Sequence, residues 1–177
     1  LFDTFKDTIN INQGNEDGRT VLMTIAQCKT SEKTIQYLCD TFKDKININK
    51  QDNEGTTALM NAAEHNTNVA VTKYLCDTFK DTIDINQQDD YGYTTLMIAA
   101  QYNTNIEVMQ YLCKTFKDTI DISKQDNDGS AALMTMVQCE TGEKVIECLC
   151  DTFKDTIDIN MVDKYGYTAL IVAVQDN

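Results

Sequence analysis

A four-residue segment, Thr-Phe-Lys-Asp, recurs along the chain at a fixed step of 37 residues. Its five copies occupy residues 4–7, 41–44, 78–81, 115–118 and 152–155. Glycine and leucine recur at the same step, at Gly18, Gly55, Gly92, Gly129 and Gly166 and at Leu22, Leu59, Leu96, Leu133 and Leu170. A constant period of this size, with no insertion or deletion, is typical of a solenoid built from stacked structural repeats.

The unit at residues 89–125 shows what each repeat is expected to form in its first half. It opens with an acidic turn around Gly92, because glycine tolerates the positive φ that such turns require. Thr94 is a candidate N-cap, and the apolar run at residues 96–100 that follows it predicts a helix of about two turns. This helix is expected to end near residues 102–103.

The second half of the unit predicts a second helix and an extended exit. Thr104 is a candidate N-cap, and Glu107 three residues later completes a capping-box pattern. Apolar residues at nearly helical spacing carry the predicted helix as far as Phe116, and Lys117 suits the negative charge of its C-terminal end. Residues 120–123 alternate apolar and polar side chains, which favours an extended segment.

Stacking these units is expected to bury a continuous ladder of apolar side chains, because a two-helix unit cannot bury its apolar face alone. The ladder comprises the five Leu residues above, Leu38, Leu75, Leu112 and Leu149, Tyr37, Tyr74 and Tyr111, Phe42, Phe79, Phe116 and Phe153, and the Ile pairs at 46/48, 83/85, 120/122 and 157/159. Burial of one such Leu or Phe contributes roughly 1.5–3 kcal/mol, so each interface between units gains several such contributions.

The segment 89–100 has the pattern Asp-x-x-Gly-x-Thr-x-Leu-x-x-Ala-Ala, which resembles the signature of the ankyrin repeat. Residues 106–112 resemble the second helix of that repeat, and residues 84–86 resemble the extended loop that enters the next hairpin. The resemblance implies an all-α, helix-turn-helix solenoid with hairpin-like connecting loops.

The resemblance covers the whole chain, residues 1–177, as a single array. Its full repeats are 15–51, 52–88, 89–125 and 126–162, with the end of a preceding repeat at 1–14 and a partial repeat at 163–177. The unit is longer than the usual ankyrin repeat of about 33 residues, which implies an altered curvature. In the fourth repeat Ser130 and Ala131 stand where the capping Thr is expected, and Met136-Val137 replaces the paired Ala.

Seven cysteines raise the question of disulfides or zinc. One ladder position is shared by Cys39, Cys76, Cys113 and Cys150. Equivalent positions one repeat apart are expected to lie beyond the roughly 7 Å between Cα atoms that a disulfide allows, so we interpret these four as small buried hydrophobic residues. Neither the Cys148-x-Cys150 pair nor the lone Cys28 and Cys139 has the spacing of a zinc site. An odd number of unpaired thiols favours a reducing compartment, hence the cytoplasm.

The acidic turns do not complete a calcium site. Residues 126–129 imitate the end of a calcium-binding loop, but Lys124 occupies the first ligand position and Thr135 the position of the bidentate Glu. The single His, His65, is interpreted as an exposed residue of a loop between helices, since the sequence offers it no nucleophile and no orienting partner. The sequence thus predicts no enzyme activity, no metal and no cofactor.

The chain carries 15 Lys and Arg against 28 Asp and Glu, which gives a formal net charge of −13. Binding to nucleic acid phosphates needs clustered Lys and Arg, so this charge argues against a nucleic acid partner. The longest apolar run, residues 169–174, is too short to span a membrane. A protein partner with a basic surface is expected, because opposite charges steer association.

In ankyrin-like arrays partners usually bind the hairpin tips and the exposed side of the first helices, and the resemblance implies the same surface here. Carried over by position, the candidate partner-binding residues are Asn53, Glu54, His65, Asp90, Tyr91, Tyr93, Tyr102, Asn127, Asp128, Tyr165 and Tyr167. Exposed Tyr is a favoured binding residue, because it offers a large contact area with few rotatable bonds. The predicted function is a non-enzymatic scaffold for protein–protein interaction.

Two alternatives stay open. The tyrosines of the turns could pack on their neighbours and bind nothing. The chain could also be a structural element, packed end to end or within a larger assembly such as a filament or a cytoskeletal complex, because neither end shows the polar outer face of a capping repeat. In that case the chain is a window from a longer array, or other subunits cover its ends.

Overall fold

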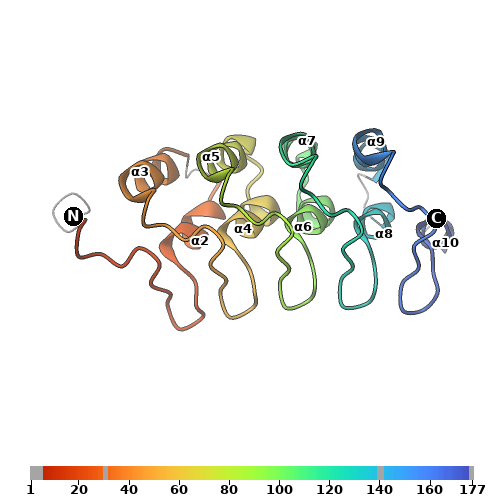
Figure 1. The fold of residues 1–177 in the computed structure, drawn as a ribbon, viewed down its shortest axis with the longest axis horizontal. Coiled ribbons are helices and arrows are strands. Elements are labelled where there is room, and N and C mark those ends of the chain that lie inside the picture. The colour runs from red at the N-terminus through yellow and green to blue at the C-terminus, as the bar shows by residue number, and fades with distance from the viewer. Residues whose placement is uncertain (1–5, 30–31, 139–141, 176–177) are drawn as a thin grey trace.

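The structure is a computed structural model, and it describes residues 6–29, 32–138 and 142–175. These residues form two layers of helices, stacked side by side along one axis, with hairpin loops projecting on one side (Figure 1). The stacked helix pairs confirm the all-α solenoid that the repeat predicts. None of the described helices is long and apolar enough to cross a lipid bilayer.

The inner layer lies next to the hairpins and contains the first helix of each repeat. Its members are α2 (Val21–Ala26), α4 (Ala58–His65), α6 (Thr95–Tyr102), α8 (Ala132–Val137) and α10 (Ala169–Gln175). The outer layer contains the second helices, α3 (Glu32–Phe42), α5 (Val69–Phe79), α7 (Ile106–Thr115) and α9 (Gly142–Phe153). Each helix packs against the next helix of its own layer, so the core continues through the whole stack.

The apolar ladder fills the space between the layers. Leu75 and Leu112 of the outer layer are fully buried, and so are Met60 and Met97 of the inner layer. The tyrosines depart from the expected core, because Tyr74 and Tyr111 are only half-buried and Tyr37 is exposed. The three cysteines at the shared ladder position in α3, α5 and α7 are fully buried, as expected, whereas Cys150 in α9 is half-buried.

The inner helices begin at the predicted threonines. Thr94 caps α6, since its hydroxyl accepts a hydrogen bond from the N–H of Met97, and its own N–H donates to the Met97 sulfur. Thr20 and Thr57 cap α2 and α4 in the same way. A methionine therefore takes the place that Glu or Gln has in the usual capping box. Helix α8 begins after Ala131 and has no side-chain cap, as the missing Thr predicts.

The start of the second helix differs from the sequence prediction, because Asn105, one residue beyond Thr104, caps α7. The side-chain oxygen of Asn105 accepts a hydrogen bond from the N–H of Glu107 at 3.0 Å. The buried side chain of Asn103 fixes this start, since its oxygen accepts from the N–H of Asn105 while its amide donates to the carbonyl of Ala63. The Thr104–Glu107 capping box was therefore the wrong prediction.

The exit from the second helix is also tighter than predicted. Helix α7 ends at Thr115, and the carbonyl of Phe116 accepts hydrogen bonds from the N–H groups of Thr119 and Ile120. Residues 122–123 form a turn, which the carboxylate of Asp121 holds by accepting from the N–H of Ser123. The segment 120–123 thus lies between the turn at residues 117–119 and the end of the turn at residues 122–123, and the strand-like alternation of its sequence reflects which side chains face the core.

Candidate partner-binding surface

The hairpin tips are joined to one another by backbone hydrogen bonds, so they form a continuous row. One bond links each successive pair of described tips, from Asn53 N–H to Asp17 C=O (2.8 Å), Asp90 N–H to Glu54 C=O (3.0 Å), Asn127 N–H to Tyr91 C=O (2.9 Å) and Lys164 N–H to Asp128 C=O (2.9 Å). The tip residues therefore have fixed positions relative to the next repeat, which lowers the conformational entropy that binding a partner would remove.

In both hairpins that carry a pair of tyrosines, a carboxylate at the base holds the backbone of the tip. Asp89 accepts hydrogen bonds from the N–H groups of Tyr91 (3.0 Å) and Tyr93 (2.8 Å). Asp163 does the same for Tyr165 and Tyr167, both at 2.8 Å. The first tyrosine of each pair is the more exposed, with 63% of Tyr91 and 72% of Tyr165 accessible, whereas Tyr93 is half-buried and Tyr167 is 38% accessible.

The glycine between Tyr91 and Tyr93 allows this hairpin to lie close to the next one. Gly92 has φ of +84°, and a Cβ at this position would lie 2.7 Å from the backbone nitrogen of Asn127 on the next tip. A side chain there is excluded by both the left-handed backbone and the neighbouring hairpin.

A hollow of about 320 Å³ opens where the last described hairpins meet the inner helices. Its tyrosines and carboxylates come from three hairpins and are Tyr93, Asp126, Asp128, Asp163, Tyr165 and Tyr167. Side chains of α8 and α10 contribute to the lining, among them Val172. We call this place the tyrosine–aspartate hollow. It brings together four of the predicted site residues, Tyr93, Asp128, Tyr165 and Tyr167.

The hollow is acidic as well as aromatic, because three of its lining residues are Asp and none is Lys or Arg. Burial raises the pKa of the Tyr93 phenol, and the negative charge of Asp126, the nearby Tyr102 and Asp128 raise it further. Tyr93 is thus neutral at physiological pH. Neutral phenol faces beside carboxylates provide cation–π and charge-assisted contacts for a Lys or Arg side chain.

Tyr102 lies at the edge of this group. It is the last residue of α6, half of its surface is exposed, and it is close enough to Tyr93 to influence the pKa of that residue. His65 has the equivalent place at the end of α4, with its Nε2 atom 3.6 Å from a carboxylate oxygen of Glu64. His65 is therefore exposed as expected, but it ends a helix, and its assignment to a loop was wrong.

The other predicted residues lie outside the hollow. Glu54, Asp90 and Tyr91 are exposed on the earlier tips. Asn53 and Asn127 are exposed too, but each side-chain amide donates a hydrogen bond to the preceding tip, at 2.9 Å to the Glu16 carbonyl and 2.7 Å to the Asp90 carbonyl. The two asparagines thus hold the row of tips together.

Sequence reasoning missed Asp126 and Asp163 as binding residues, and it considered Asp126 only as part of an incomplete calcium loop. Each does hold its turn through one carboxylate oxygen, and each also lines the hollow. The signal was the Asp that recurs at the base of four hairpins, as Asp52, Asp89, Asp126 and Asp163, and only the folded stack places the last two next to the tyrosines of another repeat. Among the described residues, no group of three or more His, Cys, Asp and Glu is arranged to hold a metal ion.

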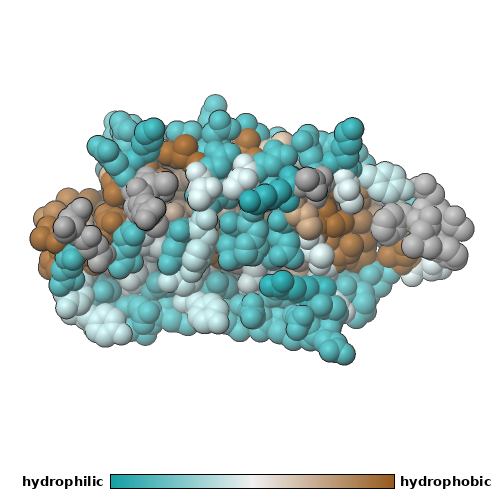
Figure 2. All heavy atoms as spheres, turned by 180° about the vertical axis from the view of Figure 1, so that it is seen from behind, coloured by the Kyte–Doolittle hydropathy of each residue, from teal (hydrophilic) through white to brown (hydrophobic). Residues whose placement is uncertain are grey.

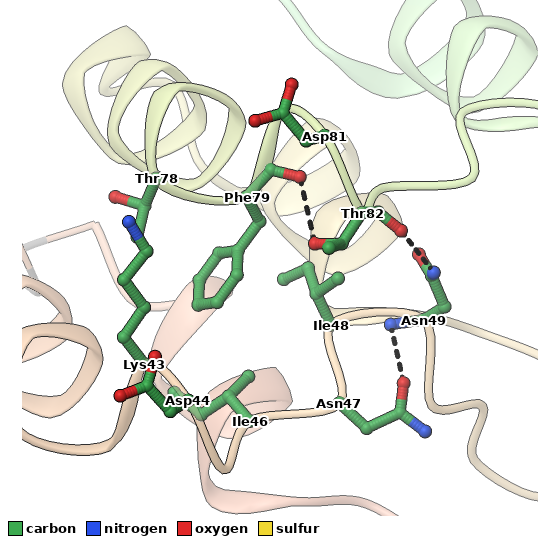
Figure 3. Close-up of a pocket in the computed structure, with 10 residues that line it drawn as sticks. All are labelled: Lys43, Asp44, Ile46, Asn47, Ile48, Asn49, Thr78, Phe79, Asp81 and Thr82. Carbon is green, nitrogen blue, oxygen red and sulfur yellow. Dashed lines mark hydrogen bonds between the residues drawn. The ribbon is translucent and has the colours of Figure 1, made fainter.

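A second kind of hollow lies between the loops that follow successive outer helices. Figure 3 shows the one after α3 and α5, where the side-chain amide of Asn49 donates to the carbonyl of Thr82 at 2.6 Å. The oxygen of the same amide accepts from the N–H of Asp84 at 2.9 Å. Asn12 and Asn86 make the same pair of bonds to their next loops. These asparagines connect the repeats, so we assign this hollow to the scaffold.

Comparison with known families adds one match. The family model for ankyrin repeats, in three copies, matches residues 2–89 and again residues 44–126. The two matches together extend over residues 2–126, which is more than half of the chain. A comparison with curated proteins finds no matching relative.

Proposed function

Because the chain belongs to the ankyrin-repeat family, whose members are generally protein–protein interaction modules, we propose that it binds a basic segment of a protein partner in the tyrosine–aspartate hollow. The repeats at 15–51, 52–88, 89–125 and 126–162 are the units of this scaffold, and the row of hairpin tips is the surface along which the partner lies. The proposal includes a non-enzymatic role and a location in the cytoplasm.

The observation that carries the proposal is the composition of the hollow. Asp126, Asp128 and Asp163 face a space that three tyrosines border, and no cationic side chain of this chain lines it. The Lys164 ammonium donates a hydrogen bond to the Asn127 carbonyl at the tip, so it does not neutralise these carboxylates from within the hollow. A Lys or Arg of a partner supplies the missing positive charge, and the tyrosines bury its aliphatic stem.

Location in the cytoplasm is supported by the thiols. The described residues contain six cysteines, and all six are free. Free thiols persist in a reducing compartment.

Peptides selected for binding test the proposal. A display library of random peptides is panned against the full chain, and the Kd of each selected peptide is measured by fluorescence polarisation at low and at high salt. We expect Lys and Arg to be enriched, and we expect affinity to fall as salt screens the carboxylates. Tyr93→Ala and Asp128→Asn should each weaken binding about 10-fold or more, a loss of roughly 1.4 kcal/mol.

The matched control is Glu107→Gln, which removes an exposed carboxylate from the outer layer. It changes the net charge by the same amount as Asp128→Asn, so it should leave Kd nearly unchanged if the hollow is the site. Selected peptides without basic residues, or equal Kd values for all three variants and the wild type, would show that the hollow is not the binding site.

A second candidate function is end-to-end assembly, and the exposed face of α10 favours it. Leu170 and Val174 have 74% and 71% of their surface accessible, and Ile171 has 42%. Figure 2 shows an apolar surface at the end of the molecule where α10 lies. A second copy that stacks on this face would continue the solenoid, since the contact is head-to-tail and can repeat.

Light scattering across a range of protein concentrations separates the two functions. Assembly predicts a mass that rises with concentration and returns to that of a monomer in Leu170→Asp. A monomer at every concentration contradicts the assembly function and leaves the binding function intact.

A further inference from the structure

The contact between the repeats 89–125 and 126–162, which we call the 125/126 joint, departs from the contacts before it. At each of the two preceding contacts, a tyrosine of one outer helix donates a hydrogen bond to an Asp of the helix before it. The pairs are Tyr74–Asp40 at 2.6 Å and Tyr111–Asp77 at 2.5 Å. One step of 37 residues later, Cys148 and Lys114 take these two places. Cys148 has no hydroxyl and the Lys114 ammonium cannot accept a hydrogen bond, so this bridge is lost.

A second bridge is lost in the loops that follow the outer helices. Asn12, Asn49 and Asn86 each join their own loop to the next one through both atoms of the side-chain amide. Ser123 takes this position at the 125/126 joint, and its hydroxyl donates to the carboxylate of Asp121 in its own loop at 2.6 Å. The asparagine bridge of the preceding joints is therefore missing here.

Two contacts at the helix starts are replaced as well. The side-chain amide of Asn105, at the start of α7, donates to the Thr67 carbonyl of the repeat before it at 2.8 Å. One step later Gly142 has no side chain with which to make this bond. Thr94 caps α6, whereas Ala131 leaves α8 without a side-chain cap. The polar contacts of the outer helix, the loop and the helix starts thus change together in one repeat.

Hollows lie where the bridges are missing. One of about 510 Å³ lies between α7 and α9, with Gln110 and Cys148 in its lining. Another of about 500 Å³ lies between the loops beside Ser123, whereas the equivalent hollow beside Asn49 is about 350 Å³ (Figure 3). Space between neighbouring repeats removes packing contacts and lowers the free energy that the repeats gain by stacking.

The hairpin side and the apolar core still hold the 125/126 joint closed. The N–H of Asn127 donates to the Tyr91 carbonyl at 2.9 Å, and its side-chain amide donates to the Asp90 carbonyl at 2.7 Å. Met136 of α8 and Leu149 of α9 are fully buried. The repeat 126–162 is therefore packed on the repeat before it, but without the outer-helix and loop bridges of the preceding joint.

We propose that the 125/126 joint is a built-in opening point, at which the repeats from residue 126 onward open as one unit while the repeats before it stay folded. The stability of a stack of repeats is the sum of the units and of the contacts between neighbours. The weakest contact therefore decides where the stack divides into parts that open independently. Three replaced bridges and two hollows coincide at this one contact.

The opening controls the tyrosine–aspartate hollow, a step that rests on the proposed function. Tyr93 belongs to the repeat before the joint, whereas the other two tyrosines and the three carboxylates of the hollow follow it. Opening therefore separates Tyr93 from the rest of the lining. A basic segment bound in the hollow contacts both sides of the joint, so it binds the closed form and stabilises it.

Hydrogen exchange of the full chain, followed by mass spectrometry of its peptides, measures the opening of each helix. We expect the amide protons of α8 and α9 to exchange at least 10-fold faster than those of α5 and α7, after correction for intrinsic rates. This change should be a step at the 125/126 joint, whereas fraying lowers protection gradually towards both ends. Equal protection of the four helices, or a gradual decline without a step, would overturn the proposal.

Restoring the bridges is the decisive substitution. Lys114→Asp/Ser123→Asn/Cys148→Tyr gives the 125/126 joint the residues of the preceding joint, so it should slow exchange in α8 and α9 at least 10-fold and leave α5 unchanged. Ser123→Asn alone, at an exposed loop position, should slow it about 5-fold. This single variant carries the test if circular dichroism shows that the triple variant does not fold.

The matched control weakens the preceding joint by the reverse changes. Asp77→Lys/Asn86→Ser/Tyr111→Cys should move the step to the contact between the repeats 52–88 and 89–125, so that α7 exchanges at least 10-fold faster than in the wild type. Asn86→Ser alone is the milder version if the triple variant does not fold. In folded protein, unchanged exchange in α8 and α9 of the restored chain, or in α7 of the control, would contradict the opening point.

A peptide selected for the hollow tests the link between the joint and the binding site. At ten times its Kd the peptide should slow exchange in α8 and α9 about 10-fold and leave α3 unchanged, because the open form does not bind it. A peptide that binds without slowing this exchange would show that the joint does not control the hollow. If no peptide binds, the proposed function fails, and the exchange of the free chain then decides on the joint by itself.

Discussion

Tyr74 on α5 donates a hydrogen bond to the carboxylate of Asp40 on α3, with 2.6 Å between the two oxygens. The contact crosses from one outer helix to the one before it, and Tyr111 repeats it one unit later with Asp77. The Tyr111 ring also has the ammonium of Lys73 at 5.5 Å from its centroid. These half-buried tyrosines therefore bind the outer layer together through their polar ends as well as their rings.

The Tyr74–Asp40 bond predicts an alkaline loss of stability. Burial, and then the hydrogen bond to Asp40, raises the pKa of Tyr74 from 10.0 to about 12. The folded chain thus holds this proton more tightly than the unfolded chain, so the stabilisation is complete below pH 10 and is lost as pH rises towards 12. Tyr74→Phe should lower the free energy of unfolding at pH 8 by about 1 kcal/mol, a difference that shrinks between pH 10 and 12.

Urea unfolding at several pH values measures this difference. Asp40→Asn is the control, because an amide oxygen still accepts the hydroxyl proton but carries no charge, and its alkaline effect should be smaller. A constant difference between Tyr74→Phe and the wild type from pH 8 to 12 would contradict the assignment.

Gly92 and Gly166 form a natural pair for a second prediction. Both have a left-handed backbone, with φ of +84° and +81°. A Cβ on Gly92 would meet the next hairpin at 2.7 Å, whereas a Cβ on Gly166 would meet nothing within 4 Å. Gly166→Ala should cost only the left-handed strain, roughly 1–2 kcal/mol. Gly92→Ala should cost at least about 1 kcal/mol more, because the backbone of the neighbouring tip must move. Similar losses in denaturant unfolding would argue against close contact between the tips.

Leu112 tests the core of the outer layer. Its side chain is fully buried, so Leu112→Ala should lower the free energy of unfolding by about 2–5 kcal/mol. Leu170→Ala is the matched control, since 74% of that residue is exposed and its removal leaves no cavity. A thermal melt unchanged by Leu112→Ala would contradict the core assignment.

The asparagine contacts between the loops predict a stabilising substitution. Asn49 and Asn86 each bridge to the next loop, but at the following position Ser123 uses its hydroxyl and its N–H on Asp121. The hollow beside Asn49 is about 350 Å³, and the equivalent one beside Ser123 is about 500 Å³, as a shorter side chain requires. Ser123→Asn should bridge to Thr156 and Asp158 and raise stability by about 1 kcal/mol.

The reverse substitution is the control for that prediction. Asn86→Ser should lose the bonds to the Thr119 carbonyl and the Asp121 N–H and should lower stability by a similar amount. Urea unfolding could show a loss for Asn86→Ser and no gain for Ser123→Asn. In that case the loop after α7, which holds Ser123, does not follow the geometry of the loop after α5, which holds Asn86.

Much of the fold could be predicted because the repeat places the same residue types at the same step. The caps at Thr20, Thr57 and Thr94, the turn glycines and the uncapped start of α8 all depend on residues close in sequence. The start of α7 could not be predicted in this way. It depends on Asn103, whose amide reaches the Ala63 carbonyl 40 residues earlier, a contact that exists only in the stack.

The candidate partner-binding site differs in the same respect. The tyrosines of the hollow could be predicted as binding residues, but the sequence does not show that Tyr93 and Tyr165, which lie two repeats apart, line the same hollow.

The uncapped start of α8 gives the last prediction, which tests whether the repeats are interchangeable. Ala131 occupies the position of Thr94, both residues are almost fully buried, and Met134 stands where Met97 completes the cap of α6. Ala131→Thr should therefore recreate the cap and raise the free energy of unfolding by about 1 kcal/mol. Thr94→Ala removes the same bond from α6 and should cost a similar amount. Denaturant unfolding of the two variants gives the comparison, and a loss in Ala131→Thr would mean that the Met136-Val137 packing has shifted α8 out of the register in which the cap can form.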